Sequence, residues 1–585
     1  MRQPQSAWYN YRMPKQTSPI RNDRPVAYFC AEYGISDRLP IYSGGLGILA
    51  GDIVQEAANL QLPFVAIGLF YKQGYFHQRS NENGQQEYAQ TINAVEAGLT
   101  LLTEHDDTLL IEVPVEERTV YAQVWRFPVG ENFLYLLDTD HWKNSEADRL
   151  ITDQLYSGVQ EKRIMQELVL GIGGLRLTER LKLNPSLYHM NEGHSAFMAL
   201  ELIATYLDRS GSNYDDAVRR AKRQLIFTNH TLVPAGNDAF PNESIRRLLG
   251  RYCLDSHLGL ERVLTLGSAE VPDHFSMVML AMRMASISNA VSKVHAKKAA
   301  ELWPKYPLKA ITNGVHLPAW VSPELQLLYE QAMPNWKQKA SDPKLWNGVR
   351  SLPSEMLWEA HRHLKGLLLD DVYARTGIRL DLEVLTVVWA RRFATYKRPD
   401  LLFSDIEKLK ALLFSKQPIQ ILIAGKSHPA DSQGKEIIKH IERLANFELK
   451  HRAVFVDDYS ITLSKVLVAG ADIWLNTPIY GLEASGTSGM KAAANGVLQC
   501  TVPDGWAAEV DWNGRGFVLP ADKTETAIYP LFAKKIVPAY YKRGRSGLPE
   551  TWLNMMKESI ATISPRFSSQ RLVEEYVSQL YGPLI

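Results

Sequence analysis

Short apolar runs alternate with amphipathic stretches along most of the chain, and this alternation predicts strands that are each followed by a helix. In the first half, the run 26–31 is followed by a glycine-rich turn, a helix that reaches about residue 60, and a second apolar run at 63–70. Runs of this length are typical of strands buried on both faces, as in parallel sheets. The pattern therefore predicts a βαβ unit at the start of a Rossmann-like domain.

The second half repeats this pattern more regularly. The apolar runs that we expect to form buried strands lie at 384–389, 419–424, 453–456 and 473–475. The helical stretches between them lie near 398–414, 434–446 and 463–469. Strands that alternate with helices predict a parallel sheet covered on both faces. We therefore predict an α/β fold with two Rossmann-like domains, 1–320 and 321–585, that face each other across a cleft.

Three other segments extend this prediction. Partial alternation of apolar and polar residues at 121–127 and 133–137 indicates a pair of strands joined by a short turn. Long helices are predicted over 161–181 and 275–298, and the apolar stripe of the second belongs in the core. A last helix, 569–580, would pack back across the domains, by analogy with the fold.

Composition and charge narrow the class of protein. The chain has 585 residues, 45% of them hydrophobic and 22% charged, which is typical of a globular protein with more than one core. Its net charge of +1 gives no case for nucleic acid or an acidic membrane as a partner. No apolar run is long enough to span a bilayer, and residues 1–24 lack the apolar core of a signal peptide. The three cysteines lack metal-site spacing, so we expect no metal, and they fit a cytoplasmic location.

The segment 483–496 reads EASGTSGMKAAANG and follows the strand-like run 471–476. A small-residue turn into a helix presents free backbone N–H groups that suit an anion. Lys491 falls near the first helical turn, where a cation is disfavoured, so we expect a lowered pKa and an amine able to form a Schiff base. An aldehyde that carries a phosphate, as pyridoxal phosphate does, would suit such a site. The alternative is a glycine-rich connection with one solvated lysine.

Basic residues follow the apolar run 384–389, within the segment ARRFATYKRP at 390–399. Such charge runs usually form a solvated face. Here they follow a strand, and open α/β sheets bind ligands at the carboxyl ends of their strands. Arginine offers a planar fork to phosphate oxygens and lysine a point charge, so this segment is a candidate phosphate site.

The glycine-rich loop YSGGLGILAGD at 42–52 leads from a strand into a helix. Such a loop can hold a phosphate at the helix N-terminus. More often its glycines only permit close packing of the backbone.

Two histidines also follow predicted strands. His194 lies in the segment SLYHMNEGHSAF at 186–197, and His230 lies in IFTNHTLVP at 226–234. A ligand-binding role competes here with a structural one, in which Thr228 and Asn229 cap a helix.

The segment from Glu483 to Lys491 resembles the cofactor segment of the glycogen/α-glucan phosphorylases, whose lysine holds pyridoxal phosphate. Related glycosyltransferases that use nucleotide sugars carry two acidic residues eight positions apart, and here the second of these positions is Lys491. The resemblance extends over roughly residues 25–510. It implies the GT-B architecture and a phosphorylase rather than a synthase.

The resemblance also implies roles for individual residues. The implied cofactor-binding residues are Lys491, Arg391, Tyr459, Trp320, Gly45 and Thr487. The implied catalytic residues are Arg392, Lys397, His230 and Glu483. Arg392 and Lys397 would bind substrate phosphate, His230 the glucosyl 6-hydroxyl, and Glu483 the sugar hydroxyls. The implied substrate-binding residues are Gly44, Gly47, Glu192, His194, Asn313, Lys426, Ala484, Ser485 and Gly486.

Some positions depart from the family. Ser460 stands where animal members have arginine, and Gly34 replaces a tyrosine near the cofactor ring, so the packing around the cofactor stays open. Only 24 residues precede Pro25, so we expect no control by AMP or phosphorylation of the animal kind.

The resemblance implies an enzyme that uses pyridoxal phosphate to split α-1,4-glucans (glycogen, starch or maltodextrin) with inorganic phosphate. The product would be α-glucose 1-phosphate of retained configuration. One alternative is a nucleotide-sugar-dependent glucosyltransferase, which would need the missing second acidic residue. Another is a carbohydrate-binding protein without turnover, which would not need three phosphate-directed cations. Glucan length preference, flux and oligomeric state, including a homo-oligomer, stay open.

Overall fold

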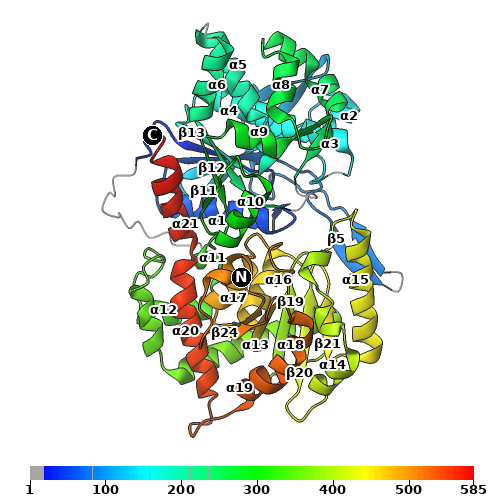
Figure 1. The fold of residues 1–585 in the computed structure, drawn as a ribbon, viewed down its shortest axis with the longest axis vertical. Coiled ribbons are helices and arrows are strands. Elements are labelled where there is room, and N and C mark those ends of the chain that lie inside the picture. Colours follow the sequence, from blue (N-terminus) through cyan, green and yellow to red (C-terminus); the bar gives the residue numbers. More distant parts are fainter. Residues whose placement is uncertain (1–18, 82–83, 157, 211–212, 233–236) are drawn as a thin grey trace.

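The computed structural model describes residues 19–81, 84–156, 158–210, 213–232 and 237–585 (Figure 1). Two large sheets organise these residues. In the described part of the chain, the first sheet has ten strands, and its order is β10–β11–β12–β4–β1–β13–β14–β17–β18, with β7 beside β11. All pairs from β12 to β18 are parallel, while β7, β10 and β11 pair antiparallel. Their bounds are β10 Leu110–Val115, β11 Arg118–Val129, β12 Asn132–Asp138, β4 Phe64–Leu69, β1 Val26–Phe29, β13 Leu187–Asn191, β14 Leu225–Asn229, β17 Ile287–Ala290, β18 Lys309–Ala310 and β7 Thr100–Leu101.

The second sheet is parallel throughout, and in the described residues it has six strands in the order β21–β20–β19–β22–β23–β24. Their bounds are β21 Ala453–Val456, β20 Ile419–Ala424, β19 Leu385–Ala390, β22 Ile473–Asn476, β23 Leu498–Thr501 and β24 Gly516–Val518. The four strands predicted in this half are confirmed. Strands β23 and β24 were not predicted, because runs of four and three residues are too short to show a clear periodic pattern.

Helices cover both sheets. In the first half they are α1 Gly45–Asn59, α2 Glu146–Arg149, α3 Gln160–Leu168, α4 Gly174–Arg180, α5 Met198–Ser210, α6 Tyr214–Arg223, α7 Asn242–Asp255, α8 Leu260–Gly267, α9 Met277–Met284 and α10 Lys293–Leu302. In the second half they are α11 Leu317–Trp320, α12 Pro323–Ala332, α13 Ser354–Thr376, α14 Ile406–Leu413, α15 Ser432–Arg443, α16 Ile461–Gly470, α17 Ser488–Ala494, α18 Thr524–Leu531, α19 Val537–Tyr541, α20 Glu550–Arg566 and α21 Ser569–Tyr576. Two-stranded pairs complete the fold: β2 Tyr33–Ser36 with β3 Leu39–Ile41, β5 His77–Asn81 with β6 Gly84–Tyr88, β8 Thr103–Glu104 with β9 Asp107–Thr108, and β15 Ala239–Pro241 with β16 His274–Ser276.

The register of the parallel strands brings several loops to one edge of each sheet. In the first sheet, Val26 of β1 is level with Leu187 of β13, so the residues that follow both strands emerge together. In the second sheet, Ala390 of β19 is level with Ala424 of β20. This edge is where open α/β sheets bind ligands.

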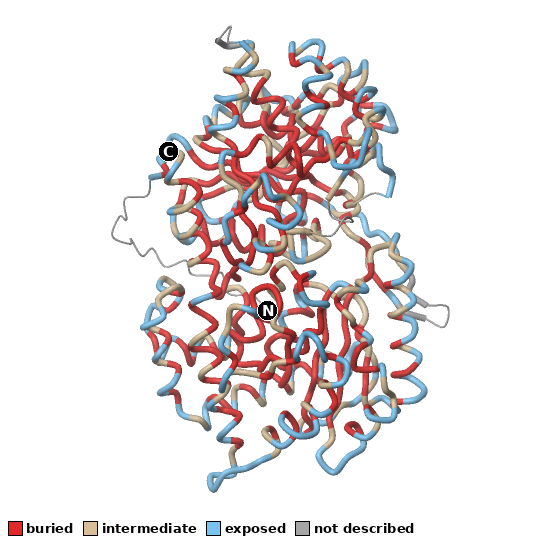
Figure 2. The backbone as a smooth tube through the Cα atoms, viewed as in Figure 1, coloured by how far each residue is buried: buried red, intermediate tan, exposed pale blue. Residues whose placement is uncertain are grey.

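The buried residues form two hydrophobic clusters, one around each sheet (Figure 2). The first runs from Ile20 to Ile311 and also contains residues of α21 and the turn after it. The second runs from Val315 to Phe567 and also takes in Ile48 of α1. The last helix therefore packs back against the first sheet, as predicted. The domain boundary between residues 320 and 321 stays a prediction.

Two predicted helices differ from the structure. The prediction of one helix over 275–298 is wrong, because this segment contains the end of β16, α9, β17 and most of α10. Strand β17 pairs with β14, and this tertiary pairing outweighs the helix propensity of the small residues. The helix predicted over 161–181 is present, but a π-helical turn at Val169–Gly173 interrupts it.

In the described part of the chain, no helix has both the length and the apolar character needed to cross a bilayer. Most of the segment 1–24, on which the prediction about a signal peptide rests, lies outside the described residues. The three cysteines are free and buried.

Candidate active site

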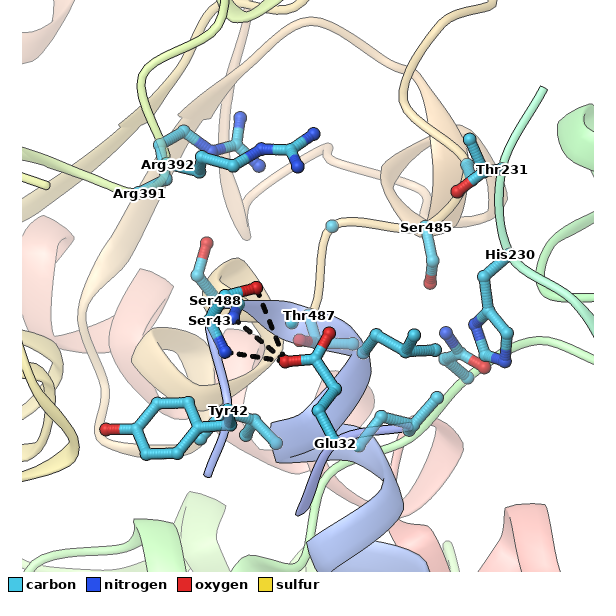
Figure 3. A pocket seen from close by; sticks show the side chains of 18 of the residues that line it. Glu32, Tyr42, Ser43, His230, Thr231, Arg391, Arg392, Ser485, Thr487 and Ser488 are labelled. Carbon is cyan, nitrogen blue, oxygen red and sulfur yellow. Dashed lines mark hydrogen bonds between the residues drawn. The ribbon is translucent and has the colours of Figure 1, made fainter. Parts of the chain in front are cut away.

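A cavity of about 360 Å³ lies where the carboxyl ends of the two sheets face each other. Its walls come from both halves of the chain, and Figure 3 shows side chains from both. All the predicted site residues line this cavity except Gly47. At Gly47 a Cβ atom would lie 2.7 Å from Cβ of Tyr42 and 2.9 Å from Oε2 of Glu32, so this glycine permits close packing.

Lys491 lies at the end of the first turn of α17, and its side chain is buried. Its Nζ atom is 3.6 Å from the ring centroid of Trp320, within the range of a cation–π interaction. Burial lowers the pKa of Lys491 to about 8; the charge of Asp52 opposes this shift and that of Lys465 adds to it. The predicted direction is confirmed. The main cause of the lowered pKa is desolvation, whereas the prediction rested on the helix dipole.

Asn495 fixes the backbone around this lysine. Its Nδ2 atom donates to the carbonyl oxygens of both Lys491 and Trp320, at 2.9 Å each. Its Oδ1 atom accepts the backbone N–H of Ser322 at 2.8 Å. One side chain thus ties α17 to the segment that carries Trp320.

Arg391 and Lys397, from the basic segment after β19, share one buried carboxylate. Nη2 of Arg391 lies 3.1 Å and Nζ of Lys397 lies 2.8 Å from Oε2 of Glu483. Burial alone would raise the pKa of Glu483, but the two cations outweigh it and lower the value to about 2. Nε and Nη1 of Arg391 are buried without a hydrogen-bond partner. These two groups can therefore donate hydrogen bonds to a further anion.

Arg392 extends beside Arg391, but it is exposed to the open cavity (Figure 3). Its positive charge adds to the lowering of the pKa of Glu483 and opposes the rise in the pKa of Glu32 that burial causes. Arg392 thus offers an exposed cation on the wall of the cavity.

The glycine loop is held by Glu32. The Oε2 atom of Glu32 accepts the backbone N–H groups of Ser43 and Gly44 at 2.6 and 3.3 Å (Figure 3). Its Oε1 atom accepts the hydroxyl of Tyr156 at 2.8 Å. A Cβ atom at Gly44 or Gly45 would meet nothing within 4 Å. These two glycines therefore leave open space at the start of α1.

Glu192 orients His230. Its carboxylate accepts the backbone N–H of His230 at 2.8 Å and Nδ2 of Asn229 at 3.2 Å. Glu192 has a φ of +71°, a strained conformation for a side chain of this size and one that recurs at functional sites. Burial raises the pKa of Glu192 to about 8 and lowers that of His230 to about 3. The His230 ring is therefore neutral near pH 7, and its Nε2 lies 2.5 Å from Oδ1 of Asn191.

His194 lies beside a cluster of buried charges. Within the described residues, potential ligand atoms of Glu167, His194 and Asp238 lie within 4.8 Å of one another. Nε2 of His194 is 3.7 Å from Oδ2 of Asp238, which also pairs with Arg163. Burial raises the pKa of Glu167 well above its usual value and lowers that of His194 to about 4. Arg163 already supplies a positive charge to this cluster through Asp238. We therefore infer that the cluster holds the ring of His194 in place.

Lys426 joins the two halves at the rim of the cavity. Its Nζ atom lies 2.6 Å from Oδ1 of Asp458 and donates to the carbonyl of Phe76 at 3.0 Å. Nδ1 of His77, in β5, lies 2.8 Å from Oδ2 of Asp458. The β5–β6 hairpin thus reaches the second sheet, beside α15 in Figure 1.

The other predicted residues lie as follows. Oδ1 of Asn313 and Oγ of Ser485 are buried without partners and face the cavity. The carbonyl of Ala484 accepts the hydroxyl of Ser292 at 2.6 Å. Gly486 has a φ of +88°, which requires glycine for the turn into α17. Thr487 precedes this helix but does not cap it with its side chain.

The two departures from the family have structural explanations. Ser460 caps α16 by accepting the backbone N–H of Leu463 at 3.2 Å. Its neighbour Tyr459 lines the cavity and donates to Oγ of Ser464 at 3.0 Å. At Gly34 a Cβ atom would lie 2.5 Å from Cδ1 and 3.2 Å from Cα of Ile48, so a larger residue here would require Ile48 of α1 to shift.

Three acidic residues of the site were missed by the sequence analysis: Glu32, Asp52 and Asp504. Oδ2 of Asp504 accepts the backbone N–H groups of Gly481 and Glu483, at 2.8 and 3.0 Å, and so shapes the loop that carries Glu483. Asp52 ends the glycine-rich segment 42–52, and Glu32 follows the apolar run 26–31; an acidic residue directly after a predicted strand was the available signal for Glu32.

The residues present fit pyridoxal phosphate. The cavity contains a buried amine on Lys491, and Arg391 presents two buried nitrogen atoms without a partner. An aldehyde needs the first feature and a phosphate the second. The unpartnered donors are the observation that an anionic group would explain.

Two largely parallel sheets with a cavity between their carboxyl ends are the architecture of the GT-B glycosyltransferases. Comparison with known proteins gives the family. The sequence profile of a family described as carbohydrate phosphorylase matches residues 260–514.

Relatives match nearly the whole chain. It is 40% identical to the maltodextrin phosphorylase of Thermococcus litoralis, over 99% of this chain and 72% of that protein. It is 36% identical to the glycogen phosphorylase of Mycobacterium tuberculosis, over 98% of this chain and 73% of that protein. It is 35% identical to the glycogen phosphorylase of Aquifex aeolicus, over 96% of this chain and 87% of that protein. The chain therefore belongs to the carbohydrate phosphorylase family, an enzyme family of the GT-B fold.

Proposed function

We propose that the chain is an α-glucan phosphorylase that cleaves terminal α-1,4-linked glucosyl units with inorganic phosphate and releases α-glucose 1-phosphate. Glycogen, starch and maltodextrin contain this linkage. The observation that carries the proposal is the arrangement of Arg391, Lys397 and Lys491 around one cavity, with unpartnered donors on Arg391. The names of the relatives support the same activity.

Lys491 would hold pyridoxal phosphate, with Arg391, Tyr459, Gly45 and Thr487 near its phosphate and Trp320 beside its ring. When bound, the cofactor supplies a phosphate with a second pKa near 6, close enough to neutral pH for proton exchange. Arg391 is suited to this phosphate because two of its donors have no other partner. Cofactor binding stays a proposal that rests on family membership and on this fit.

Arg392 and Lys397 would bind the substrate phosphate. Arg392 is exposed to the cavity, so its charge needs no rearrangement to receive an anion. Lys397 is paired with Glu483, so an incoming phosphate would share this cation with the carboxylate. Both cations would stabilise the negative charge of the phosphate as the glycosidic bond breaks.

The sugar would be oriented by neutral groups and one carboxylate. His230 is uncharged, so it would act as a hydrogen-bonding partner for the 6-hydroxyl and not as a proton donor of the usual histidine kind. Glu483 would accept sugar hydroxyls. The rest of the proposed sugar and phosphate site consists of Glu192, His194, Asn313, Lys426, Gly44 and the backbone of 484–486. Gly47 would act indirectly, because it permits the close packing that shapes the glycine loop.

The test is release of glucose 1-phosphate from maltodextrin. We expect release that requires inorganic phosphate, together with a cofactor absorbance band. Borohydride reduction followed by peptide mapping should place the label on Lys491, and Lys491→Ala should lose both band and activity. Lys408→Ala, at an exposed surface lysine, is the matched control.

Other results would support the alternatives. Consumption of ADP- or UDP-glucose without phosphate would indicate the nucleotide-sugar glucosyltransferase. Glucan binding without glucose 1-phosphate release would indicate a binding protein. Cytoplasmic location and assembly into a homo-oligomer stay predictions.

A further inference from the structure

Asp52 is a buried carboxylate to which none of the roles above assigns a function. It lies in α1, and its carboxylate accepts three hydrogen bonds. Nε1 of Trp320 donates to Oδ1 at 2.9 Å and to Oδ2 at 3.1 Å. Oδ2 also accepts the backbone N–H of His316 at 3.2 Å. These bonds fix the carboxylate against the edge of the Trp320 indole.

The face of the same indole carries Lys491, whose Nζ is 3.6 Å from the ring centroid. Within the described residues, no hydrogen bond or ion pair involves this amine, and its close contact is the Trp320 ring. An indole attracts a cation through the negative charge of its face. A hydrogen bond from the indole N–H to a carboxylate increases that negative charge. Asp52, at the edge of the ring, therefore strengthens the attraction between the face of the ring and the amine of Lys491.

We propose that Asp52 is a positioning residue for Lys491. Through Trp320 it fixes where the amine lies, and its negative charge opposes the effect of Lys465, whose Nζ atom lies 5.9 Å from the centroid of the same ring. The proposal rests on the proposed function in one respect, namely that Lys491 is the residue that holds the cofactor.

The electrostatics around Lys491 agree with this geometry. The charged groups that face Lys491 are Asp52 from α1 and Lys465 from α16. Burial lowers the pKa of Lys491 to about 8, Asp52 opposes this shift, and Lys465 adds to it. The effect is mutual, because burial raises the pKa of Asp52 and Lys491 limits the rise. Removing the carboxylate should therefore lower the pKa of Lys491 further and leave its amine neutral more often at pH 7.

The contact also joins the two halves of the site. Asp52 follows the glycine loop, two turns along α1 from Gly45, whereas Lys491 belongs to α17 behind the second sheet. The position of Asp52 therefore depends on how α1 lies against Trp320 and α17. The reactivity of Lys491 should report on that arrangement.

The experiment measures the amine of Lys491 directly, without cofactor or substrate. Cofactor-free protein is labelled with a trace of acetic anhydride between pH 6 and 10, and modification of Lys491 is quantified by peptide mass spectrometry. In the unaltered protein we expect a midpoint near pH 8. Asp52→Asn keeps the shape and an acceptor oxygen but removes the charge. A pKa lower by about one unit would raise labelling at pH 7 about fivefold.

Glu56→Gln is the matched control. Glu56 is also a buried carboxylate of α1, one turn beyond Asp52, but it accepts a hydrogen bond from Ser569 and not from Trp320. Its variant should leave the labelling profile of Lys491 unchanged. Identical profiles for Asp52→Asn and the unaltered protein would overturn the proposal, as would an equal shift in Glu56→Gln.

A second variant keeps the proposal testable if Asp52→Asn misfolds, which circular dichroism would reveal. Trp320→Phe keeps an aromatic face but removes the indole N–H, so we expect a smaller shift in the same direction; an unchanged profile would contradict the proposal. Because the labelling needs no cofactor, its outcome is separate from the proposed activity. Failure of the unaltered protein to bind pyridoxal phosphate would refute the proposed function and leave the labelling result standing.

Discussion

The Nζ atom of Lys397 lies 2.8 Å from Oε2 of Glu483, deep in the cavity. The same carboxylate oxygen lies 3.1 Å from Nη2 of Arg391. One acid, assigned to the sugar, thus balances two cations, assigned to the two phosphates. This arrangement keeps both cations in place in a buried site, where an unpaired charge would be costly.

Lys397→Met should weaken phosphate binding with little change in glucan binding. The variant keeps most of the side-chain volume but loses a charge-assisted contact of about 2 kcal/mol, which corresponds to a roughly 30-fold higher KM for phosphate. Initial rates at saturating maltodextrin measure this change. Lys410→Met, at a surface lysine paired with Glu407, is the control. Equal KM values for phosphate in the unaltered protein and Lys397→Met would refute the assignment.

Glu483→Gln should lower stability at neutral pH, and the difference should shrink in acid. The pKa of Glu483 is about 2 in the folded protein against a usual value of 4.5, because its two cations outweigh the effect of burial. A lowered carboxyl pKa contributes stability that is fully present above the unfolded value and is lost as the pH falls through the folded value. The contribution is about 3 kcal/mol at pH 7 and declines from about pH 5 downward.

Urea unfolding of both proteins at pH 7, 5 and 4 measures this difference. Glu407→Gln, at an exposed glutamate, should show no such pH dependence. A difference between Glu483→Gln and the unaltered protein that grows as the pH falls would contradict the assigned ion pairs.

The sequence was most informative where burial is complete. The bounds of β20 and β21 were predicted to the residue, because short, mostly apolar runs between polar loops leave little choice of where each strand begins and ends. The position of the site was also predictable, since residues at the carboxyl ends of parallel strands must meet at one edge.

Contacts between residues far apart in the chain could not be predicted. The pairing of Glu483 with Lys397 joins positions 86 residues apart, and the bond from Trp320 to Asp52 joins positions 268 residues apart. Local patterns carry no information on such pairs. For the same reason the prediction of one helix over 275–298 is wrong, because pairing of Ile287 with Ile226 makes part of this segment a strand.

His230→Ala should reduce turnover without moving the acid limb of the pH profile. Burial lowers the pKa of His230 to about 3, so the ring stays neutral throughout the working range. Loss of this neutral hydrogen bond, which leaves the sugar hydroxyl unsatisfied, should cost about 1–3 kcal/mol in kcat/KM, a roughly 5- to 150-fold decrease. The measurement is kcat/KM for maltodextrin from pH 5 to 8. Loss of a titration near pH 6–7 in the variant would show that His230 carries a proton in the reaction.

Asp472→Asn should destabilise the second sheet more than any change at the cavity. Asp472 is fully buried at the start of β22, where it lies 2.6 Å from Nζ of Lys365 and 2.7 Å from Nε2 of His361. It also accepts the backbone N–H of Thr386 at 2.7 Å. Removing its charge leaves the charge of Lys365 uncompensated in the core. This should lower the free energy of unfolding by about 3–5 kcal/mol.

The test is chemical denaturation of the unaltered protein, Asp472→Asn and the double variant Asp472→Asn/Lys365→Met. It separates the cost of the uncompensated lysine from the cost of lost packing and hydrogen bonds. If the cost comes from the uncompensated lysine, the double variant should recover part of the lost stability, because two apolar or neutral groups replace a buried ion pair at little cost. Asp511→Asn, at an exposed position, controls for the substitution itself. A double variant less stable than Asp472→Asn would indicate that packing and hydrogen bonds of Lys365, which also contacts Tyr540 at 2.9 Å, outweigh its charge.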